Sequence, residues 1–269
     1  MTNDYTINNK INGAITGFLL GDTLLCNKPS ECSEILSVIL ESINETKEID
    51  LFNIMEKISE WYVSGDSVNS RVSIAQAVRF FMQGMPVHKI HIDQEEMEDD
   101  VALLFALPFA ISCLEKDTRI LFQHIQSVVQ MFSNNNNTFF ACNFFACAIR
   151  HLVLQQKTSS TQIIATYYQD NQLLLEAFKE FALQKQQVYE SKLKPTEKNI
   201  TSFTLWKAWQ YYETSNCNMQ TAINNVKKNN DSSMVASIAC SFIGASAGMT
   251  NEIFNLAKIK NIDISKFLT

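Results

Sequence analysis

Apolar residues recur at intervals of three and four positions along most of the chain, the spacing that places them on one face of a helix. No long alternating pattern of the kind typical of strands occurs between these runs. The sequence therefore predicts an all-α fold, one compact multi-helix domain of about a dozen helices. The predicted helices span residues 11–25, 33–43, 51–63, 74–82, 101–114, 119–132, 139–155, 160–169, 173–190, 203–214, 219–226 and 234–247.

The first predicted helix has glycine at every fourth position. Gly13, Gly17 and Gly21 leave one face of this helix without side chains, so that a second helix can approach closely. The segment 1–10 before it is expected to form a loose N-terminal tail. No linker-like stretch is long enough to divide the chain, so residues 1–269 are expected to form one domain.

Composition agrees with a helical fold and argues against two classes of partner. Only seven glycines and four prolines occur in 269 residues, too few for the many tight turns of a β-sandwich or barrel. The net charge of −6 argues against nucleic-acid binding, which needs a basic surface. The apolar stretches 101–114 and 235–249 are shorter than the roughly 18 to 20 residues of a membrane span, so no membrane association is expected.

Seven cysteines are scattered mostly through apolar runs, and no two of them form a CxxC pair. An odd number of cysteines in such positions is typical of reduced, buried thiols in a reducing compartment. We therefore expect a cytoplasmic location. The four histidines provide no zinc-site spacing with these cysteines.

Two segments place polar residues beside helices that are rich in small residues. One runs from Gly13 to Asp22 and reads GAITGFLLGD, and the other spans residues 229–248 and reads NNDSSMVASIACSFIGASAG. Small residues let helices pack tightly, so a carboxylate beside them is held where two or more helices meet. Helical bundles build metal sites in this way.

These segments resemble the opening helix and the C-terminal signature of the ADP-ribosylglycohydrolase family, of the dinitrogenase-reductase-activating type. That signature is a Gly-Gly-Asp-x-Asp-Thr loop followed by an Ala-rich helix. Shorter matches appear in the family's order at 61–65 (WYVSG), 102–108, 147–149 (CAI) and 204–208 (TLWKA). The resemblance covers the chain from about residue 11 to 255 and implies an ADP-ribosylglycohydrolase-like fold.

The resemblance also implies a magnesium site. In this family a Thr-Asp-Asp segment and the Asp-x-Asp-Thr segment hold two Mg²⁺ ions, which orient the ribose hydroxyls and a water. Their equivalents here are Ser30, Glu31, Cys32, Asp231, Ser233 and Met234. Sulfur and a neutral hydroxyl replace several of the charged oxygen ligands that Mg²⁺ prefers. Two carboxylates cannot offset two divalent ions, so we expect a divergent member with degraded metal-binding motifs; a single ion held by Glu31 and Asp231 stays open.

The positions that would bind substrate have changed as well. The resemblance places them at Asp99, Asp100, Asn134 and Ile200. Two of these are carboxylates where the family has glycine amides that cradle a diphosphate, and carboxylates would repel it. The family's long loop before the first ligand segment is reduced to the seven residues between Asp22 and Ser30. No catalytic residue can be assigned.

Each acidic candidate also has a structural interpretation. Asp22 is expected to be a buried carboxylate that accepts hydrogen bonds from helix-end amides. Asp231 is either the N-cap of the helix that follows or a residual metal ligand. Glu31 is expected to be a solvated loop acid rather than a ligand, and the acidic run 95–100 a solvated approach to the next helix.

Two functions from different classes remain open. One is an active ADP-ribosyl hydrolase that removes ADP-ribose from protein side chains with a reduced, single-magnesium site. The other is a degenerate member with weak or no hydrolase activity, a binding or regulatory module towards ADP-ribose, an ADP-ribosylated protein or an ADP-ribosyltransferase. Because the ligand, loop and phosphate-cradle positions have changed together, we favour the degenerate member.

Overall fold

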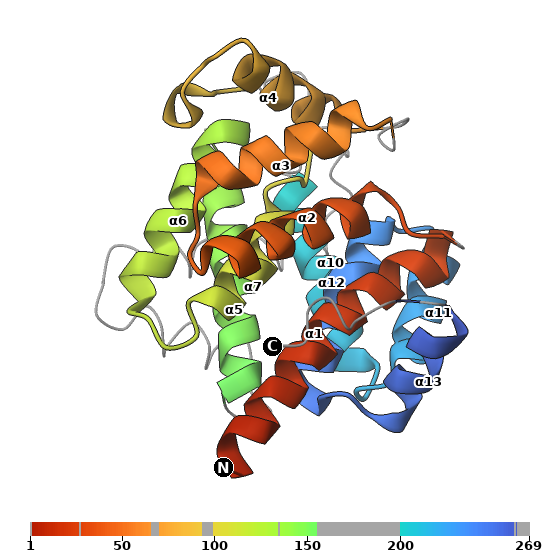
Figure 1. Ribbon diagram of the computed structural model, residues 1–269. Helices are drawn as coiled ribbons and strands as arrows, with labels where there is room; N and C mark the ends of the chain where they lie inside the picture. The colour runs from red at the N-terminus through yellow and green to blue at the C-terminus, as the bar shows by residue number, and fades with distance from the viewer. Residues whose placement is uncertain are drawn as a thin grey trace.

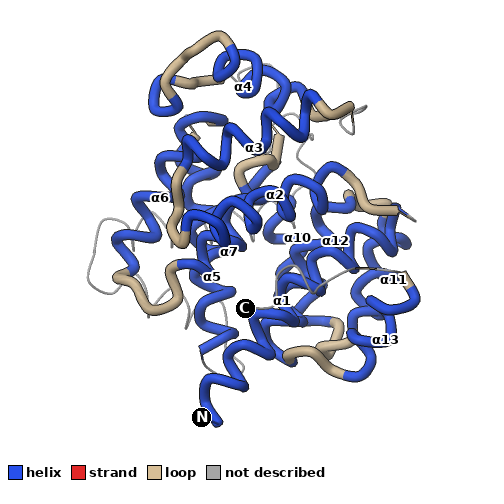
Figure 2. Tube along the Cα trace, viewed as in Figure 1, coloured by secondary structure: helices blue, strands red, loops and turns tan. Residues whose placement is uncertain are grey.

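Helices account for all regular secondary structure in the part of the chain that the computed structural model describes, residues 2–26, 28–65, 70–92, 99–133, 135–154, 200–260 and 262 (Figures 1 and 2). They are α1 (Thr2–Cys26), α2 (Glu31–Thr46), α3 (Leu51–Val63), α4 (Val72–Met82), the 3-10 helix η1 (Val87–Lys89), α5 (Leu103–Ser112), α6 (Thr118–Phe132), α7 (Asn136–Leu154), α10 (Ile200–Thr214), α11 (Met219–Asn229), α12 (Ser233–Ala247) and α13 (Asn251–Ile259). This confirms the all-α prediction. The predicted helices 160–169 and 173–190 lie outside the described residues.

Helices α1 and α12, from opposite ends of the chain, pack side by side with their backbones in contact (Figure 1). A Cβ atom added to Gly13 would lie 2.4 Å from the carbonyl oxygen of Gly244. One added to Gly17 would lie 2.2 Å from the carbonyl oxygen of Cys240. The third glycine of the series meets α12 in the same manner. The glycine face predicted from the sequence is therefore confirmed as the surface that admits a second helix.

The first helix is longer than the sequence pattern indicated. It begins at Thr2, so it includes most of the segment 1–10, for which a loose tail was expected. Long-range contacts hold this end of α1. The carbonyl oxygen of Asn9 accepts the N–H of Met249 at 3.2 Å, and Lys10 Nζ donates to the carbonyl oxygen of Leu152 at 2.8 Å. Both partners are far away in the sequence, where a local pattern cannot reveal them.

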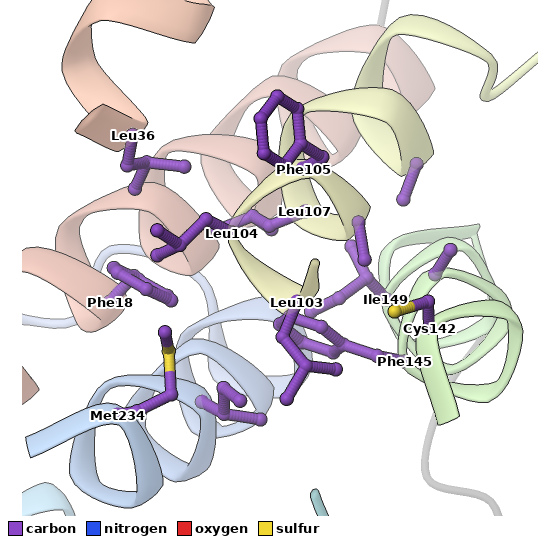
Figure 3. Packing of buried hydrophobic residues seen from close by; sticks show 14 of the residues in the cluster. Phe18, Leu36, Leu103, Leu104, Phe105, Leu107, Cys142, Phe145, Ile149 and Met234 are labelled. Atoms are coloured by element: carbon purple, nitrogen blue, oxygen red, sulfur yellow. The ribbon is translucent and has the colours of Figure 1, made fainter. Parts of the chain in front are cut away.

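One continuous cluster of buried apolar side chains fills the space between the helices. Figure 3 shows Phe18 of α1, Leu36 of α2, Leu104 of α5 and Met234 of α12 converging in it. All four are fully buried. Helix α5 is buried over nearly its whole length. The core therefore reaches the beginnings of both α2 and α12, where the metal-ligand equivalents lie.

Among the described residues, one helix, α7, is long and apolar enough to cross a membrane. The core helix of a soluble protein passes the same test, and 78% of the apolar stretch of α7 is buried inside the protein. Its Phe144 ring lies 4.8 Å from Trp206 and 5.3 Å from Trp209, measured between ring centroids. Both tryptophans are buried. We conclude that α7 is a core helix and that the two tryptophans pack against it.

All seven cysteines are free, and five of them are buried. Burial raises the pKa of the Cys32 thiol to about 11 and that of Cys240 to about 12. These groups therefore stay protonated, unreactive thiols at neutral pH. The prediction of free, mostly buried thiols is confirmed.

Candidate functional site

The carboxylate of Asp22, in the last turns of α1, fixes the beginning of α2. It is fully buried. It accepts three hydrogen bonds from N–H and O–H donors and a fourth from the Cys26 thiol. Its Oδ2 accepts the backbone N–H of Ser30 at 2.7 Å and the hydroxyl of Ser33 at 2.6 Å. Its Oδ1 accepts the hydroxyl of Ser30 at 2.6 Å. The expectation of a buried carboxylate that accepts helix-end amides is confirmed, and the anion lies where the α2 dipole is positive.

Arg71, the residue before α4, connects the first turn of α2 to the turn that precedes α5. Its backbone N–H donates to Glu31 Oε1 at 2.7 Å, and its Nε lies 3.9 Å from Glu31 Oε2. Its Nη2 lies 3.1 Å from Asp100 Oδ1. Glu31 is thus the first residue of α2 with a side chain only 14% exposed, so its interpretation as a solvated loop acid is wrong. A local pattern could not show that Arg71 covers it.

The two aspartates before α5 are held by α4 and α10. The hydroxyl of Ser73 donates to the Asp99 carboxylate, which also accepts the N–H of Val101 at 3.0 Å. The hydroxyl of Thr204 donates to Asp100 Oδ2 at 2.9 Å. These carboxylates are therefore hydrogen-bonded and largely buried, and the expected solvated approach is wrong for the end of the acidic run. Residues 93–98 lie outside the described part of the chain.

Burial and the neighbouring charges shift the pKa values of Arg71 and of the carboxyl groups around it in opposite directions. Burial raises the pKa of Glu31 and of Asp99 above the usual values for these carboxyls, although Arg71 pulls both down. Burial alone would lower the pKa of the Arg71 guanidinium, but the negative charges of Asp100 and Glu31 outweigh that effect and the net shift is upward. The arginine is therefore a permanent cation among carboxyl groups that are costly to bury as anions.

Asp231 lies between α11 and α12 and binds a different cation. It accepts a hydrogen bond from the Tyr211 hydroxyl, and Lys207 Nζ lies 3.5 Å from its Oδ2. The same ammonium lies over the rings of Phe203 and Tyr211, at 5.7 and 5.8 Å from their centroids. Burial, together with the hydrogen bond to Asp231, raises the pKa of Tyr211, which therefore remains a hydrogen-bond donor at neutral pH.

Asp231 is not the N-cap of α12. Helix α11 ends with Asn230 in the left-handed conformation, φ 55°, and the N–H of Asp231 donates back to the carbonyl oxygen of Val226 at 3.1 Å. The cap is Ser232, which is extended and accepts the N–H of Val235 at 3.4 Å. The turn that closes α11 therefore directs the Asp231 carboxylate to α10, and the serine after it takes the capping role.

The other ligand-equivalent residues are parts of helix ends or of the core. Ser30 is the N-cap of α2, and the Cys32 side chain is buried behind it. Burial and the charge of Asp22 raise the pKa of the Cys26 thiol, while a hydrogen bond with Ser233 lowers it. Met234 is fully buried in the core near Phe18 (Figure 3). Sulfur thus stands at two of these positions, Cys32 and Met234, while Ser30 and Ser233 offer neutral hydroxyls.

The resemblance also predicts that Ile200 and Asn134 bind substrate. Ile200 is the first residue of α10 and is 41% exposed. Asn134 lies outside the described residues.

Sequence reasoning missed Arg71, Lys207 and Tyr211. The only available signal was the four-residue spacing of Lys207 and Tyr211, which places them on one face of a helix.

The donors do not fit a pair of magnesium ions. Glu31 and Asp231, the two carboxylates at ligand-equivalent positions, each contact a side-chain cation. Met234 offers a buried thioether, and Mg²⁺ takes hard oxygen ligands in octahedral geometry. In the described part of the chain no group of three or more His, Cys, Asp or Glu side chains is arranged to hold a metal ion.

No family model matches the sequence, and no curated protein matches it. By structure, 33 chains of known structure match. One is an ADP-ribosylglycohydrolase-related protein complex, with a TM-score of 0.66, 14% sequence identity, and 98% of each chain covered. At this identity the likeness shows the fold alone. The chain therefore has an ADP-ribosylglycohydrolase-like fold over nearly its full length.

Proposed function

We propose that this protein is a degenerate relative of the ADP-ribosylglycohydrolases, with weak or no hydrolase activity, which acts as a cytoplasmic binding or regulatory module. One observation carries the proposal. The two carboxylates that remain at ligand-equivalent positions, Glu31 and Asp231, are both engaged by cations of the chain itself, Arg71 and Lys207. A divalent ion would have to displace these cations before it could bind.

The fold supports a role in ADP-ribosylation, although a fold does not establish an activity. As partners we propose ADP-ribose, an ADP-ribosylated protein or an ADP-ribosyltransferase. Asp99 and Asp100 are fixed by hydrogen bonds. The sequence resemblance equates them with the family's diphosphate-binding segment, where glycine amides hold the ligand. We therefore expect free ADP-ribose to bind weakly, and a protein partner to supply most of the contact.

The test combines calorimetry with an assay for release of ADP-ribose. Wild-type protein is titrated with Mg²⁺ and with ADP-ribose, and is incubated with proteins that carry ADP-ribosyl-arginine or ADP-ribosyl-serine. We expect no Mg²⁺-dependent release above that of the Asp231→Ala variant. Glu115→Ala, at an exposed position, serves as the control for loss of a carboxylate. Turnover that requires Mg²⁺, survives in Glu115→Ala and disappears in Asp231→Ala would establish the single-magnesium hydrolase instead.

A further inference from the structure

We infer that the exposed surface of α3 and α4 is a dimer interface, on which a second copy of this chain docks about a two-fold axis that runs along the two helices. In this arrangement α3 of each copy lies against α4 of the other. The inference does not depend on the proposed function, because it uses none of the residues at ligand-equivalent positions.

Exposed apolar side chains are concentrated on these two helices. Nine large apolar side chains are exposed among the described residues, and four of the nine belong to α3 and α4. These four are Phe52 (58% exposed), Val63 (64%), Val72 (53%) and Met82 (61%). Figure 1 shows α4 at the edge of the molecule, beyond α3. Single exposed apolar residues are common on protein surfaces, whereas a concentration on two neighbouring helices is typical of an interaction surface.

The four side chains occupy the two ends of an antiparallel helix pair. The rings of Phe52, near the start of α3, and Phe81, near the end of α4, lie 5.3 Å apart between centroids. Phe52 and Met82 therefore share one end of the pair. Val63, the last residue of α3, and Val72, the first of α4, share the other end. Rotation about an axis along the helices brings like ends together, so each apolar end meets its counterpart in the second copy.

The charges between the apolar ends are complementary under the same rotation. Glu56 lies four residues from Phe52, and Arg79 lies three residues from Met82, so both are about one helical turn inside the same end. Both side chains are exposed, and neither forms a salt bridge with another described residue. The rotation places Glu56 of each copy opposite Arg79 of the other, and this contact occurs twice.

This charge pattern favours a second copy over a partner of uniform charge. A uniformly basic or acidic surface would be repelled by either Arg79 or Glu56, whereas the rotated copy presents the opposite charge to both. Because each copy uses the same surface, the association closes at two subunits and leaves no free interface for a filament.

The first experiment measures molar mass by analytical ultracentrifugation over protein concentrations of about 1 to 100 µM. We expect a wild-type dimer with a Kd of about 10 µM, at the weak end of what protein interfaces reach. Met82→Asp should raise the Kd about tenfold or more, because it places a charge in an apolar contact. Ile259→Asp is the matched control, since it also replaces the exposed last residue of a helix, and it should dimerise like the wild type.

The second experiment exchanges the charges. Glu56→Arg and Arg79→Glu should each weaken dimerisation about tenfold, because two contacts between like charges replace two between opposite charges. An equimolar mixture of these two variants should form a heterodimer about as tight as the wild-type dimer, since both contacts then join opposite charges again. Both changes are at exposed positions, so the Tm of each variant should stay within about 2 °C of the wild type.

Each outcome bears on the inference. A wild type that stays monomeric at about 100 µM overturns it. A dimer that Met82→Asp leaves intact, or that Ile259→Asp weakens equally, overturns it too, because the contact would then lie elsewhere. A mixture of Glu56→Arg and Arg79→Glu that associates no better than either variant alone refutes the two-fold arrangement.

Discussion

The contact between α1 and α12 makes Gly17→Ala a sharp test of the fold. The added Cβ would lie 2.2 Å from the carbonyl oxygen of Cys240, whereas real Cβ atoms essentially never come closer than 3.0 Å. The nearest atoms are backbone, which cannot rotate away as a side chain does. The two helices must therefore separate by most of an ångström along part of their length.

Two effects of opposite sign determine the size of the change. Forcing an extra carbon into a packed interface costs about 3 kcal/mol when neither backbone can yield easily. Replacing glycine by alanine within a helix returns about 1 kcal/mol. The net loss should be about 2 kcal/mol, which corresponds to a fall in Tm of about 4 to 8 °C.

Chemical and thermal denaturation followed by circular dichroism would measure this loss. The control is Ala75→Gly on α4, which tests the helix propensity of glycine away from the α1–α12 contact and should cost about 1 kcal/mol. A valine at position 17 should be worse than alanine, because the obstruction grows with side-chain size. The reasoning is refuted if Gly17→Ala is as stable as the wild type or more stable.

Three further predictions concern carboxyl groups and cysteine thiols. Asp22→Ala should lower the free energy of unfolding by about 3 kcal/mol in urea denaturation, since it removes the acceptor of the buried Ser33 hydroxyl and of the partly buried N–H and hydroxyl of Ser30. Asp22→Asn should cost less because it keeps an acceptor, and equal losses would contradict this. A thiol reagent on native protein should label Cys26 and Cys217, the two cysteines that are not buried, with all seven reacting in denaturant; rapid native labelling of a buried thiol would show that the core opens. Burial raises the pKa of Glu31 above its ordinary value of 4.5, so its ionised form lowers stability as pH rises through the folded pKa. The stability of Glu31→Gln relative to wild type should therefore increase from acid to neutral pH, and a decrease would show that the contact with Arg71 outweighs burial.

Local sequence patterns were sufficient for the features that depend on neighbours in the chain. Glycines four residues apart predict a bare helix face wherever that helix packs, and the face of Gly13 and Gly17 meets α12. Asp22 follows that face directly, so its burial at a helix junction could also be predicted.

The partners of the other carboxylates could not be predicted in this way. Arg71 is far in sequence from both Glu31 and Asp100, and its position depends on how α3 packs against α2 and α4 against α3. The choice of Ser232 over Asp231 as a cap depends on the left-handed turn at Asn230. Such contacts are set by tertiary packing, which overrides what a residue type alone favours.

Among the described helices, the pairing of α1 with α12 joins the first to the last but one. Contacts over such a separation form late, because the entropy of closing so large a loop must be lost before they stabilise anything. During synthesis the N-terminal helix emerges from the ribosome long before its mate exists. The side chains and the glycine face of α1 that are buried in the folded protein therefore stay uncovered until α12 has been synthesised.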